Sequence, residues 1–566
     1  MELARPSKTM SLVSKILPSW KNAVLALLSA GLLILAFPDF EWWWMAWFAL
    51  VPLMWAIERE KESVVRSFVV GWIFGTTFFF GTCWWLTFAP ITYAGFPWPL
   101  AYFLILIATL GAGVFPAIFA AITSIFLRRF GSWAFLAAPF AWVFTEFLRY
   151  WLTGNNWNAI GYSQAFSGRG IFLASFGGIS IVSFALLLPM SILSWLVFSE
   201  NSIVKSDSFK KAVSGIMLSR TRFWSALEEN RMFRLSDNPR IVLHYFLIVV
   251  LAIGTVGFTV FLIRDDHYFA TISDSPKVTS IVAIQPNVPM SSLDLTKWRH
   301  LRQRQIEQAE AAIRQLPTAD RQLPTTVILP ESPMNFMYED DREFQKFIDD
   351  FARRNNVSVL FNSAEPDATN GKYFNSAVMV GPDGREAGQY DKIFLLPFGE
   401  AVPPPLDAIV PGFVGNFSYG REYDILPIGD AKAGVMICFE SHFGQLSREY
   451  VRNGADVLIE MTNDGYLGPT PVLRQHLANA VFRAVETNRP VLRVTNVGIT
   501  AYITEKGAVL DAAPTYQEDT RVWTVSKSDG SQTFYVKYGD WFAWLCTVVT
   551  LGLLALIVVK RKTNES

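Results

Sequence analysis

The residue of this chain best suited to covalent chemistry is Cys438, in the segment GVMICFESHFG at 434–444. An apolar run that reads as a strand ends at this thiol, and Glu440 follows two residues later. The chain has three cysteines, and the other two, Cys83 and Cys546, fall inside long apolar segments. An unpaired thiol at a strand end indicates either a nucleophile or a buried cysteine that acts as a small hydrophobe.

A cysteine nucleophile needs a group that takes its proton and a donor that stabilises the oxyanion. Histidine is the usual base. Among the five histidines, His442 is close in sequence, but it would reach Cys438 only if the chain turned helical directly after the cysteine. His476 lies on a later predicted helix. Neither histidine is therefore the first choice for the base.

A carboxylate and a lysine are the other option. Glu331, in ILPESP, follows an apolar strand, and burial there would raise its pKa and suit it to act as a general base. Lys392, in YDKIFLLPFGE, would support both the thiolate and the oxyanion, and Glu400 ends that segment and would hold the lysine. Taken singly, Glu331 also fits an ordinary strand-end acid, Lys392 a solvated lysine in a turn, and Glu400 a helix or loop cap.

The elements that would position these residues begin at Lys277, where charged residues return and strand and helix patterns alternate. Such alternation predicts a layered α/β domain with strands buried on both faces. The predicted strands are 278–288, 325–332, 357–366, 373–384, 431–441, 455–464 and 489–498, and the predicted helices are 298–316, 343–356 and 471–488.

Several of these strands end in polar residues, and sites in open α/β sheets gather at strand carboxyl ends. We therefore expect an active-site rim there. The sequence has no metal-ligand spacing, phosphate loop or dinucleotide fingerprint, so neither a metal nor a cofactor is expected. The rim residues are Glu331, Asn362, Cys438, Asn463 and Asn496.

The remainder of the chain reads as a membrane protein. Of its 566 residues 51% are hydrophobic, and the formal net charge is zero, which gives no indication of nucleic-acid binding. A span needs about 20 apolar residues, and we predict eight spans, of which the first two are short. They are 22–37, 43–57, 67–87, 99–127, 132–148, 171–199, 241–263 and 541–559.

Lysine and arginine set the predicted orientation. They gather before the first span, in alternate loops including the long one at 200–240, and after the last span, whereas loops 38–42 and 88–98 have none. Both termini are then cytoplasmic, and the α/β block lies on the far side. The predicted units are 1–21 (cytoplasmic), 22–263 (membrane domain), 277–530 (catalytic domain), 541–559 (last span) and 560–566 (cytoplasmic tail).

Glu331, Lys392 and Cys438, in that chain order, resemble the Glu-Lys-Cys triad of the nitrilase superfamily. The resemblance implies an αββα sandwich, with Glu331 as base, Lys392 as oxyanion support and Cys438 as nucleophile. With seven spans before it and one after, the chain resembles the membrane-embedded family of apolipoprotein N-acyltransferases. The similar motifs are LAFPDFEWWWMAWFALVPL, FGTTFFFGTCWW, TGNNWNAIGYSQ, QPNV, DLTKW, ILPESP, YDKIFLLPFGE, GVMICFES, MTNDGYLG and RAVETNRPVLRVTNVGITA.

This resemblance implies further residues around the triad. Trp298, in DLTKW, falls where the family has a mobile aromatic residue near the acyl chain. Glu400 and Glu440 fall on acids that the family needs. Phe439 stands beside the nucleophile, where the family often has tyrosine, so a hydroxyl role is lost there.

The implied reaction passes an acyl chain from a phospholipid to Cys438 as a thioester, and then to the α-amine of a bacterial apolipoprotein's diacylglyceryl-cysteine. The expected partners are the phospholipid, the apolipoprotein and the bilayer, with no nucleic acid. The expected setting is a monomer in the bacterial inner membrane with its catalytic domain in the periplasm. Trp157 and Phe96, in outer loops, would line the opening to the bilayer or serve as interfacial anchors.

Two other functions fit part of the pattern. A membrane-tethered amidase would keep the fold, hydrolyse small amides with water and tolerate loss of the spans. A transporter or sensor would use the α/β domain only for binding, but transport predicts charged residues within spans. The predicted spans hold little beyond Glu146 and Arg149.

Overall fold

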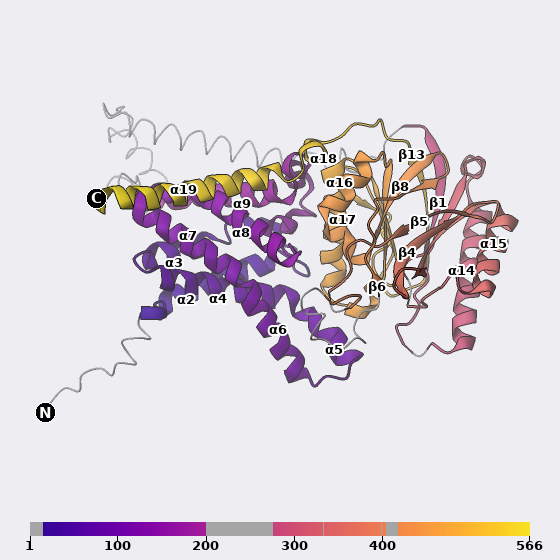
Figure 1. Ribbon diagram of the computed structural model, residues 1–566, viewed down its shortest axis with the longest axis horizontal. Helices are drawn as coiled ribbons and strands as arrows, with labels where there is room; N and C mark the ends of the chain where they lie inside the picture. Colours follow the sequence, from indigo (N-terminus) through magenta and orange to yellow (C-terminus); the bar gives the residue numbers. More distant parts are fainter. Residues whose placement is uncertain are drawn as a thin grey trace, which may run out of the picture.

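A computed structural model describes residues 15–199, 275–402 except 292, 332 and 398, and 417–565. The chain folds into a bundle of apolar helices and an α/β domain, which lie side by side along the long axis (Figure 1). The loop 200–240 and the predicted span 241–263 lie outside the described residues.

The α/β domain contains two sheets. The strands of the first are β1 (Lys277–Gln285), β2 (Thr325–Ile328), β3 (Ser358–Asp367), β4 (Lys372–Val380), β5 (Glu386–Asp391), β6 (Phe417–Ser418) and β13 (Asp519–Ser526), in the order β13-β1-β2-β3-β4-β5 with β6 beside β4. Those of the second are β7 (Ile425–Ile428), β8 (Ala431–Ile437), β9 (Val457–Thr462), β10 (Val491–Thr495), β11 (Ala501–Ile503) and β12 (Val509–Leu510), in the order β12-β11-β10-β9-β8-β7.

Helices cover the outer faces of both sheets, which confirms the predicted αββα sandwich. Helices α14 (Leu295–Gln315) and α15 (Arg342–Asn355) lie on the first sheet, and α16 (Gly444–Arg452) and α17 (Val472–Thr487) lie between the second sheet and the apolar bundle (Figure 1). Helix α15 begins at the N-cap Asp341, whose carboxylate accepts from two backbone N–H groups. Its buried face is made by Phe344, Ile348, Phe351 and Ala352, at the spacing of an amphipathic helix.

The alternation of side chains along each strand divides the core into two layers. On β1, Ile281 and Ala283 belong to the cluster between the two sheets. Val282 and Ile284 belong to the cluster that packs against α14 and α15. All four residues are fully buried, which explains why the strand reads as a continuous apolar run rather than an alternating one.

The apolar bundle has four helical stretches long and apolar enough to cross a membrane, within the part of the chain that the structure describes: Val64–Thr92, Trp98–Thr153, Gly170–Phe198 and Trp541–Val559. The second of these folds into three helices. The helices of the bundle are α2 (Trp20–Leu35), α3 (Val51–Glu60), α4 (Val64–Cys83), α5 (Phe88–Thr92), α6 (Trp98–Ala112), α7 (Val114–Phe130), α8 (Ala134–Thr153), α9 (Ala174–Phe198) and α19 (Trp541–Glu565).

Two of the predicted spans have a different form in the structure. The segment 43–57 is a short 3-10 helix at Trp43–Trp47 followed by α3, which has 10 residues. At about 1.5 Å per residue, α3 by itself reaches roughly half of a bilayer core of about 30 Å, so this segment is not one continuous spanning helix. The segment 99–127 is two helices, α6 and α7, that meet at an angle at Gly113 (Figure 1).

The bend at Gly113 has a local cause. Pro116 cannot donate a hydrogen bond to the carbonyl of Ala112, so one intrahelical bond is lost at the junction. A Cβ atom at Gly113 would lie 2.6 Å from Thr76 Oγ1. Glycine therefore allows α4 to pack directly against the junction, as small residues do between membrane helices.

Candidate active site

Cys438 lies where strand β8 ends and the 3-10 helix η9 (Cys438–His442) begins. Its backbone adopts the left-handed conformation, with φ of 54°. This conformation costs a residue with a side chain about 1–3 kcal/mol, so the surrounding structure must hold it. The residue is half-buried and its thiol is free, and a free thiol on a sharp turn at a strand end suits a nucleophile.

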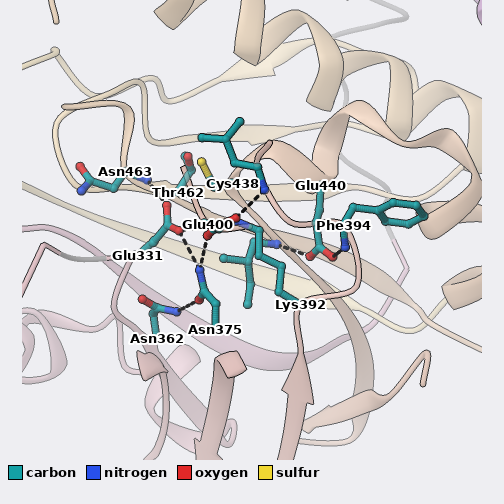
Figure 2. Close-up of polar contacts among 12 residues, drawn as sticks. Glu331, Asn362, Asn375, Lys392, Phe394, Glu400, Cys438, Glu440, Thr462 and Asn463 are labelled. Atoms are coloured by element: carbon teal, nitrogen blue, oxygen red, sulfur yellow. Dashed lines mark hydrogen bonds and ion pairs between the residues drawn. The ribbon is translucent and has the colours of Figure 1, made fainter. Parts of the chain in front are cut away.

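Glu331 and Lys392 come from two other segments and meet beside Cys438 (Figure 2). The Lys392 Nζ atom lies 3.8 Å from Glu331 Oε1 and 2.8 Å from Glu400 Oε1. Hydrogen bonding with Cys438 acts on the pKa of Glu331, so the carboxyl group is within reach of the thiol. The structure thus brings together the acid, the lysine and the cysteine, with Glu400 behind the lysine.

Asn375, on β4, links the two carboxylates. Its Nδ2 atom donates to Glu400 Oε1 at 2.7 Å and to Glu331 Oε1 at 3.3 Å. Asn362 in turn donates from its Nδ2 to Asn375 Oδ1 at 2.7 Å, which fixes the amide of Asn375. The second oxygen of Glu331 accepts from the backbone N–H of Asn463 at 3.0 Å.

The ionisation of the triad follows from burial and from its charges. Burial lowers the pKa of Lys392, but Glu400 and Glu331 outweigh burial and raise it above its ordinary value. Burial raises the pKa of Glu331, against the lowering effect of Lys392. Burial and the charge of Glu331 raise the pKa of the Cys438 thiol well above its ordinary value. The resting cysteine is therefore a neutral thiol, which needs a base at the moment of attack.

Glu440 braces the site from the other side. Its Oε1 atom accepts from Tyr390 Oη at 2.7 Å and from the N–H groups of Ile393 and Phe394 at 2.8 and 3.0 Å. Its Oε2 atom accepts from the N–H of Ile437 at 2.9 Å. One buried carboxylate therefore ties the strand before the nucleophile to the segment after Lys392.

We expect Glu440→Gln to lower both stability and activity. The amide of glutamine would place a donor against a backbone N–H, and an unpaired buried group costs about 1–3 kcal/mol. The matched control is Glu386→Gln on β5, whose side chain is exposed and whose replacement should change neither. Thermal unfolding in detergent and the rate of Cys438 acylation measure the two effects. Equal behaviour of both variants would contradict the bracing role.

The structure does not support His442 as the base. The chain does turn helical after Cys438, but the His442 Nε2 atom accepts from the backbone N–H of Asn156, in the apolar bundle, at 2.9 Å. Its ring stacks on Trp157 and Phe439, each with centroids 5.5 Å apart. Burial keeps the pKa of His442 well below its ordinary value. The imidazole thus joins the catalytic turn to the helical bundle.

The other predicted residues occupy different places. Trp298, on α14, donates from Nε1 to the Met334 carbonyl at 2.8 Å and packs edge-on against Phe336. Within the part of the chain that the structure describes, neither of these contacts is with the triad, so its place at an acyl chain stays a prediction. Phe439 also packs edge-on against Phe443 and is half-buried within the turn.

Two of the predicted rim residues stand behind the site rather than on it. Asn362 lies within β3, which continues to Asp367, so it is not at a strand end as predicted. Asn496 donates from Nδ2 to Asn463 Oδ1 at 3.1 Å and to the Val288 carbonyl at 2.9 Å. Asn362 and Asn496 therefore orient other polar side chains. Asn375, which donates directly to Glu331 and Glu400, was not predicted from the sequence.

The helical bundle reaches the mouth of the site. Tyr93, which follows α5, donates from its hydroxyl group to the Gly465 carbonyl at 3.1 Å, and its ring packs edge-on against Tyr466. Burial and the charge of Glu331 raise the pKa of Tyr466, so this half-exposed ring lies near the triad.

Gln475, on α17, makes several polar contacts between the two domains. Its Oε1 atom accepts from the indole N–H groups of Trp85 and Trp157 at 3.1 and 3.0 Å, and its Nε2 atom donates to the Thr82 carbonyl at 2.9 Å. Trp157 therefore connects the helical bundle to the α/β domain. The sequence alone allows two other roles for it, lining the opening to the bilayer or anchoring at the interface.

Neighbouring residues on α17 provide a matched test of this contact. Gln475→Leu removes the acceptor of the Trp157 indole N–H, whereas the Trp85 indole keeps its bond to the Thr82 carbonyl, and we expect the change to lower the free energy of unfolding by about 1–3 kcal/mol. Arg474 forms a half-exposed ion pair with Glu41 in which Nε and Nη2 each donate to one carboxylate oxygen, at 2.6 and 2.8 Å, and because this pair leaves no buried group unpaired, Arg474→Met should cost only about 1 kcal/mol. Thermal unfolding of both variants in detergent measures their loss of stability. Equal losses in the two variants would contradict the role of Gln475 as a buried contact between the domains.

Known proteins with related sequences match both domains. A family model described as the apolipoprotein N-acyltransferase N-terminal domain matches residues 29–192, and one described as carbon-nitrogen hydrolase matches residues 301–534. Together the two matches cover most of the chain, and each falls on the domain whose fold it describes.

Individual relatives extend this agreement. An apolipoprotein N-acyltransferase of Geobacter metallireducens is 28% identical over 553 residues, which cover 96% of each chain. One of Thermotoga maritima is 32% identical over 289 residues, 50% of this chain and 53% of its own. Among solved structures, Nit3 of Saccharomyces cerevisiae, a nitrilase-superfamily member, has a TM-score of 0.35 at 16% identity and covers 45% of this chain and 93% of its own. On the two family models and the full-length relatives, this chain belongs to the apolipoprotein N-acyltransferase family.

Proposed function

We propose that this enzyme moves a fatty acyl chain from a membrane phospholipid, through a thioester on Cys438, to the N-terminal α-amine of the S-diacylglyceryl-cysteine of bacterial apolipoproteins. This is the last step of lipoprotein maturation. One observation carries the assignment of residues: Glu331, Lys392 and Cys438 converge on a turn that is itself bonded to the helical bundle through His442.

In the first half-reaction the Cys438 sulfur attacks the ester carbonyl of the phospholipid, and Glu331 takes the thiol proton. The carbonyl oxygen becomes an oxyanion, which the Lys392 ammonium and a backbone N–H stabilise. The carbon–oxygen bond to the glycerol then breaks, Glu331 returns the proton to the leaving alkoxide, and a lysophospholipid departs. A thioester remains on Cys438.

In the second half-reaction the α-amine of the diacylglyceryl-cysteine attacks the thioester carbonyl. Glu331 takes a proton from the amine as the carbon–nitrogen bond forms, and the carbon–sulfur bond then breaks. The sulfur recovers the proton and Cys438 returns to its thiol form. The thioester keeps the acyl group activated until the amine arrives, so the reaction needs no separate energy source.

Both substrates are lipids, and the helical bundle offers them an apolar approach. A groove with a volume of about 590 Å³ runs between α2, α4 and α6, and its lining includes Phe80, Tyr102 and Phe103. Trp98 and Phe103 are exposed on α6. Tyr93, just before α6, contacts Gly465 at the mouth of the site, which supports an approach of the acyl chain along α6.

The proposal includes a placement in the cell. The enzyme lies in the bacterial inner membrane as a monomer with eight spans, both termini in the cytoplasm and the catalytic domain in the periplasm. The distribution of lysine and arginine between alternate loops supports this orientation. The same proposal sets the domain limits at 22–263, 277–530 and 541–559, and the described helices α2 to α9, the αββα domain and α19 support it.

The buried charges of the bundle favour this function over transport. Glu146 accepts from the N–H of Ile160 at 2.9 Å, and Arg149 donates to the Trp157 carbonyl at 2.9 Å. Both side chains hold the loop that contacts Gln475 and His442. They thus serve to shape the domain junction, whereas an ion path would need charges that face a water-filled passage.

The test is a transfer assay with full-length enzyme in detergent, a phospholipid labelled in its acyl chains and a synthetic diacylglyceryl-cysteine peptide. We expect labelled amide on the peptide, with lysophospholipid in equal amount. A peptide whose α-amine is acetylated is the control and should remain unlabelled. Release of labelled free fatty acid at the same rate with and without peptide would overturn the proposal in favour of a hydrolase.

A further inference from the structure

A closed group of four charged side chains lies directly behind the nucleophile, and the mechanism above does not use it. His476 and Arg493 face the carboxylates of Glu460 and Asp464, and all four side chains are buried. The Arg493 Nη2 atom donates to Asp464 Oδ2 at 2.7 Å, and its Nη1 atom pairs with Glu460. Two positive and two negative charges therefore balance within the core.

Both nitrogens of His476 face acceptors. Nδ1 lies 2.7 Å from Asp464 Oδ1, and Nε2 lies 3.0 Å from the backbone carbonyl oxygen of Cys438. Nε2 is also 3.1 Å from Glu460 Oε1. A carbonyl and an ionised carboxylate can only accept, so each ring nitrogen must carry a hydrogen atom and the ring is an imidazolium. Burial and Arg493 lower the pKa of His476, but Asp464 and Glu460 outweigh them and raise it to about 9.

The hydrogen bond from His476 to the Cys438 carbonyl fixes the orientation of the whole peptide group between Cys438 and Phe439. The peptide between Cys438 and Phe439 is planar, and in its trans form the N–H points away from the C=O. When His476 holds the carbonyl on the buried side, the Phe439 N–H must point to the opposite side. The first turn of a helix leaves such N–H groups without intrahelical acceptors, so this one is available to an oxyanion.

The position of His476 is itself fixed from the bundle side. Its neighbour Gln475 holds Trp85 and Trp157, and the Trp157 ring packs between His442 and His476, with centroid distances of 5.5 and 6.0 Å. A ring bonded at both nitrogens and covered by an indole has little freedom to move.

We propose that His476 is a positioning residue, which holds the peptide between Cys438 and Phe439 so that the sulfur and the oxyanion-binding N–H keep their catalytic orientation. This inference deepens the proposed function and rests on it for the role of Cys438. His476 takes no proton from the substrate and touches none of the reacting atoms.

Two substitutions of equal charge and similar polarity test this role. Glutamine at 476 places its amide nitrogen near the position of Nε2 and keeps a donor for the Cys438 carbonyl, whereas asparagine places it near Nδ1 and loses that donor. The two are also made in an Asp464→Asn background, which keeps the buried group neutral in total charge, so that the comparison can be made in a folded protein.

The measurements are single-turnover formation of the acyl-enzyme from a phospholipid, thermal unfolding in detergent, and alkylation of Cys438 by iodoacetamide as a function of pH. We expect H476Q and H476N to lose similar stability, while H476N acylates at least about tenfold more slowly than H476Q, since misplaced reacting groups cost up to about 100-fold. Alkylation should show the same order, because it reports the orientation of the sulfur without any acyl donor.

Equal acylation and equal alkylation by the two variants at equal stability would overturn the positioning role and leave His476 with a purely structural one. Failure of the proposed function looks different. In that case the wild-type enzyme forms no acyl adduct, while the difference in alkylation between H476Q and H476N still decides whether the histidine positions the thiol.

Discussion

Replacement of Glu331 by glutamine should slow acylation of Cys438 by about 10²–10⁴, the usual contribution of a general base. The effect is expected to be large because burial and the Glu331 charge keep the resting thiol protonated. Glutamine preserves the shape of the side chain and can still accept from Asn463, but it cannot take a proton. Stopped-flow or quenched acylation by a phospholipid measures the loss.

The pH dependence of the acylation rate should identify Glu331 as the base. Burial raises its pKa, so the wild-type rate should fall as the pH drops through a value above the ordinary 4.5, where the carboxylate becomes protonated. In Glu331→Gln this decline should be absent, and the rate should instead rise with pH as thiolate forms. The control is Glu365→Gln, a buried carboxylate on β3 that accepts from the N–H of Tyr338. An unchanged pH profile in Glu331→Gln would assign the proton transfer to another group.

Replacement of Lys392 by methionine should have two separable effects. The loss of one oxyanion donor is expected to lower the acylation rate by about 10²–10³. In addition, removal of one partner from a buried ion pair costs about 3–5 kcal/mol, since Glu400 and Glu331 are left facing each other without a cation. The lysine side chain is only 1% exposed, so water cannot replace it.

The double variant Lys392→Met with Glu400→Gln separates these effects. It removes the uncompensated charge of Glu400, and we expect it to recover most of the lost stability. Its acylation rate should remain as low as that of Lys392→Met alone, because the oxyanion donor is still absent. Thermal unfolding and acylation rates of the three proteins give the answer. Recovery of activity together with stability would show that Lys392 has only a structural role.

The sequence was sufficient to predict the sandwich and the three residues at its centre. Glu331 and Cys438 follow apolar strands, and Lys392 precedes an apolar segment, so each stands out locally and matches a known pattern. The strands could be predicted because buried strands read as continuous apolar runs. The break within the segment 43–57 was not predicted, because its apolar run is continuous although the chain forms a short 3-10 helix followed by a 10-residue helix.

The supporting contacts could not be predicted in the same way. Asn375 lies beside Ser376 in a mostly apolar strand, and its partners Glu331 and Glu400 lie 44 and 25 positions away in the chain. His476 reaches Cys438 across 38 positions. No local spacing encodes such pairs, because they depend on how β4, α17 and the turn after β8 pack. A polar residue inside an apolar element is the available signal, and it identifies a candidate without naming its partner.

Covalent attachment of an acyl chain to Cys438 is the most direct test of the proposed thioester mechanism. Intact-mass spectrometry would compare the wild-type protein with Cys438→Ala after incubation with a phospholipid of defined chains. The proposed mechanism predicts a gain of one acyl chain in the wild type, removed by hydroxylamine and absent from Cys438→Ala. An adduct that persists in Cys438→Ala, or no adduct in a wild-type protein whose thiol is confirmed to be reduced, would contradict it.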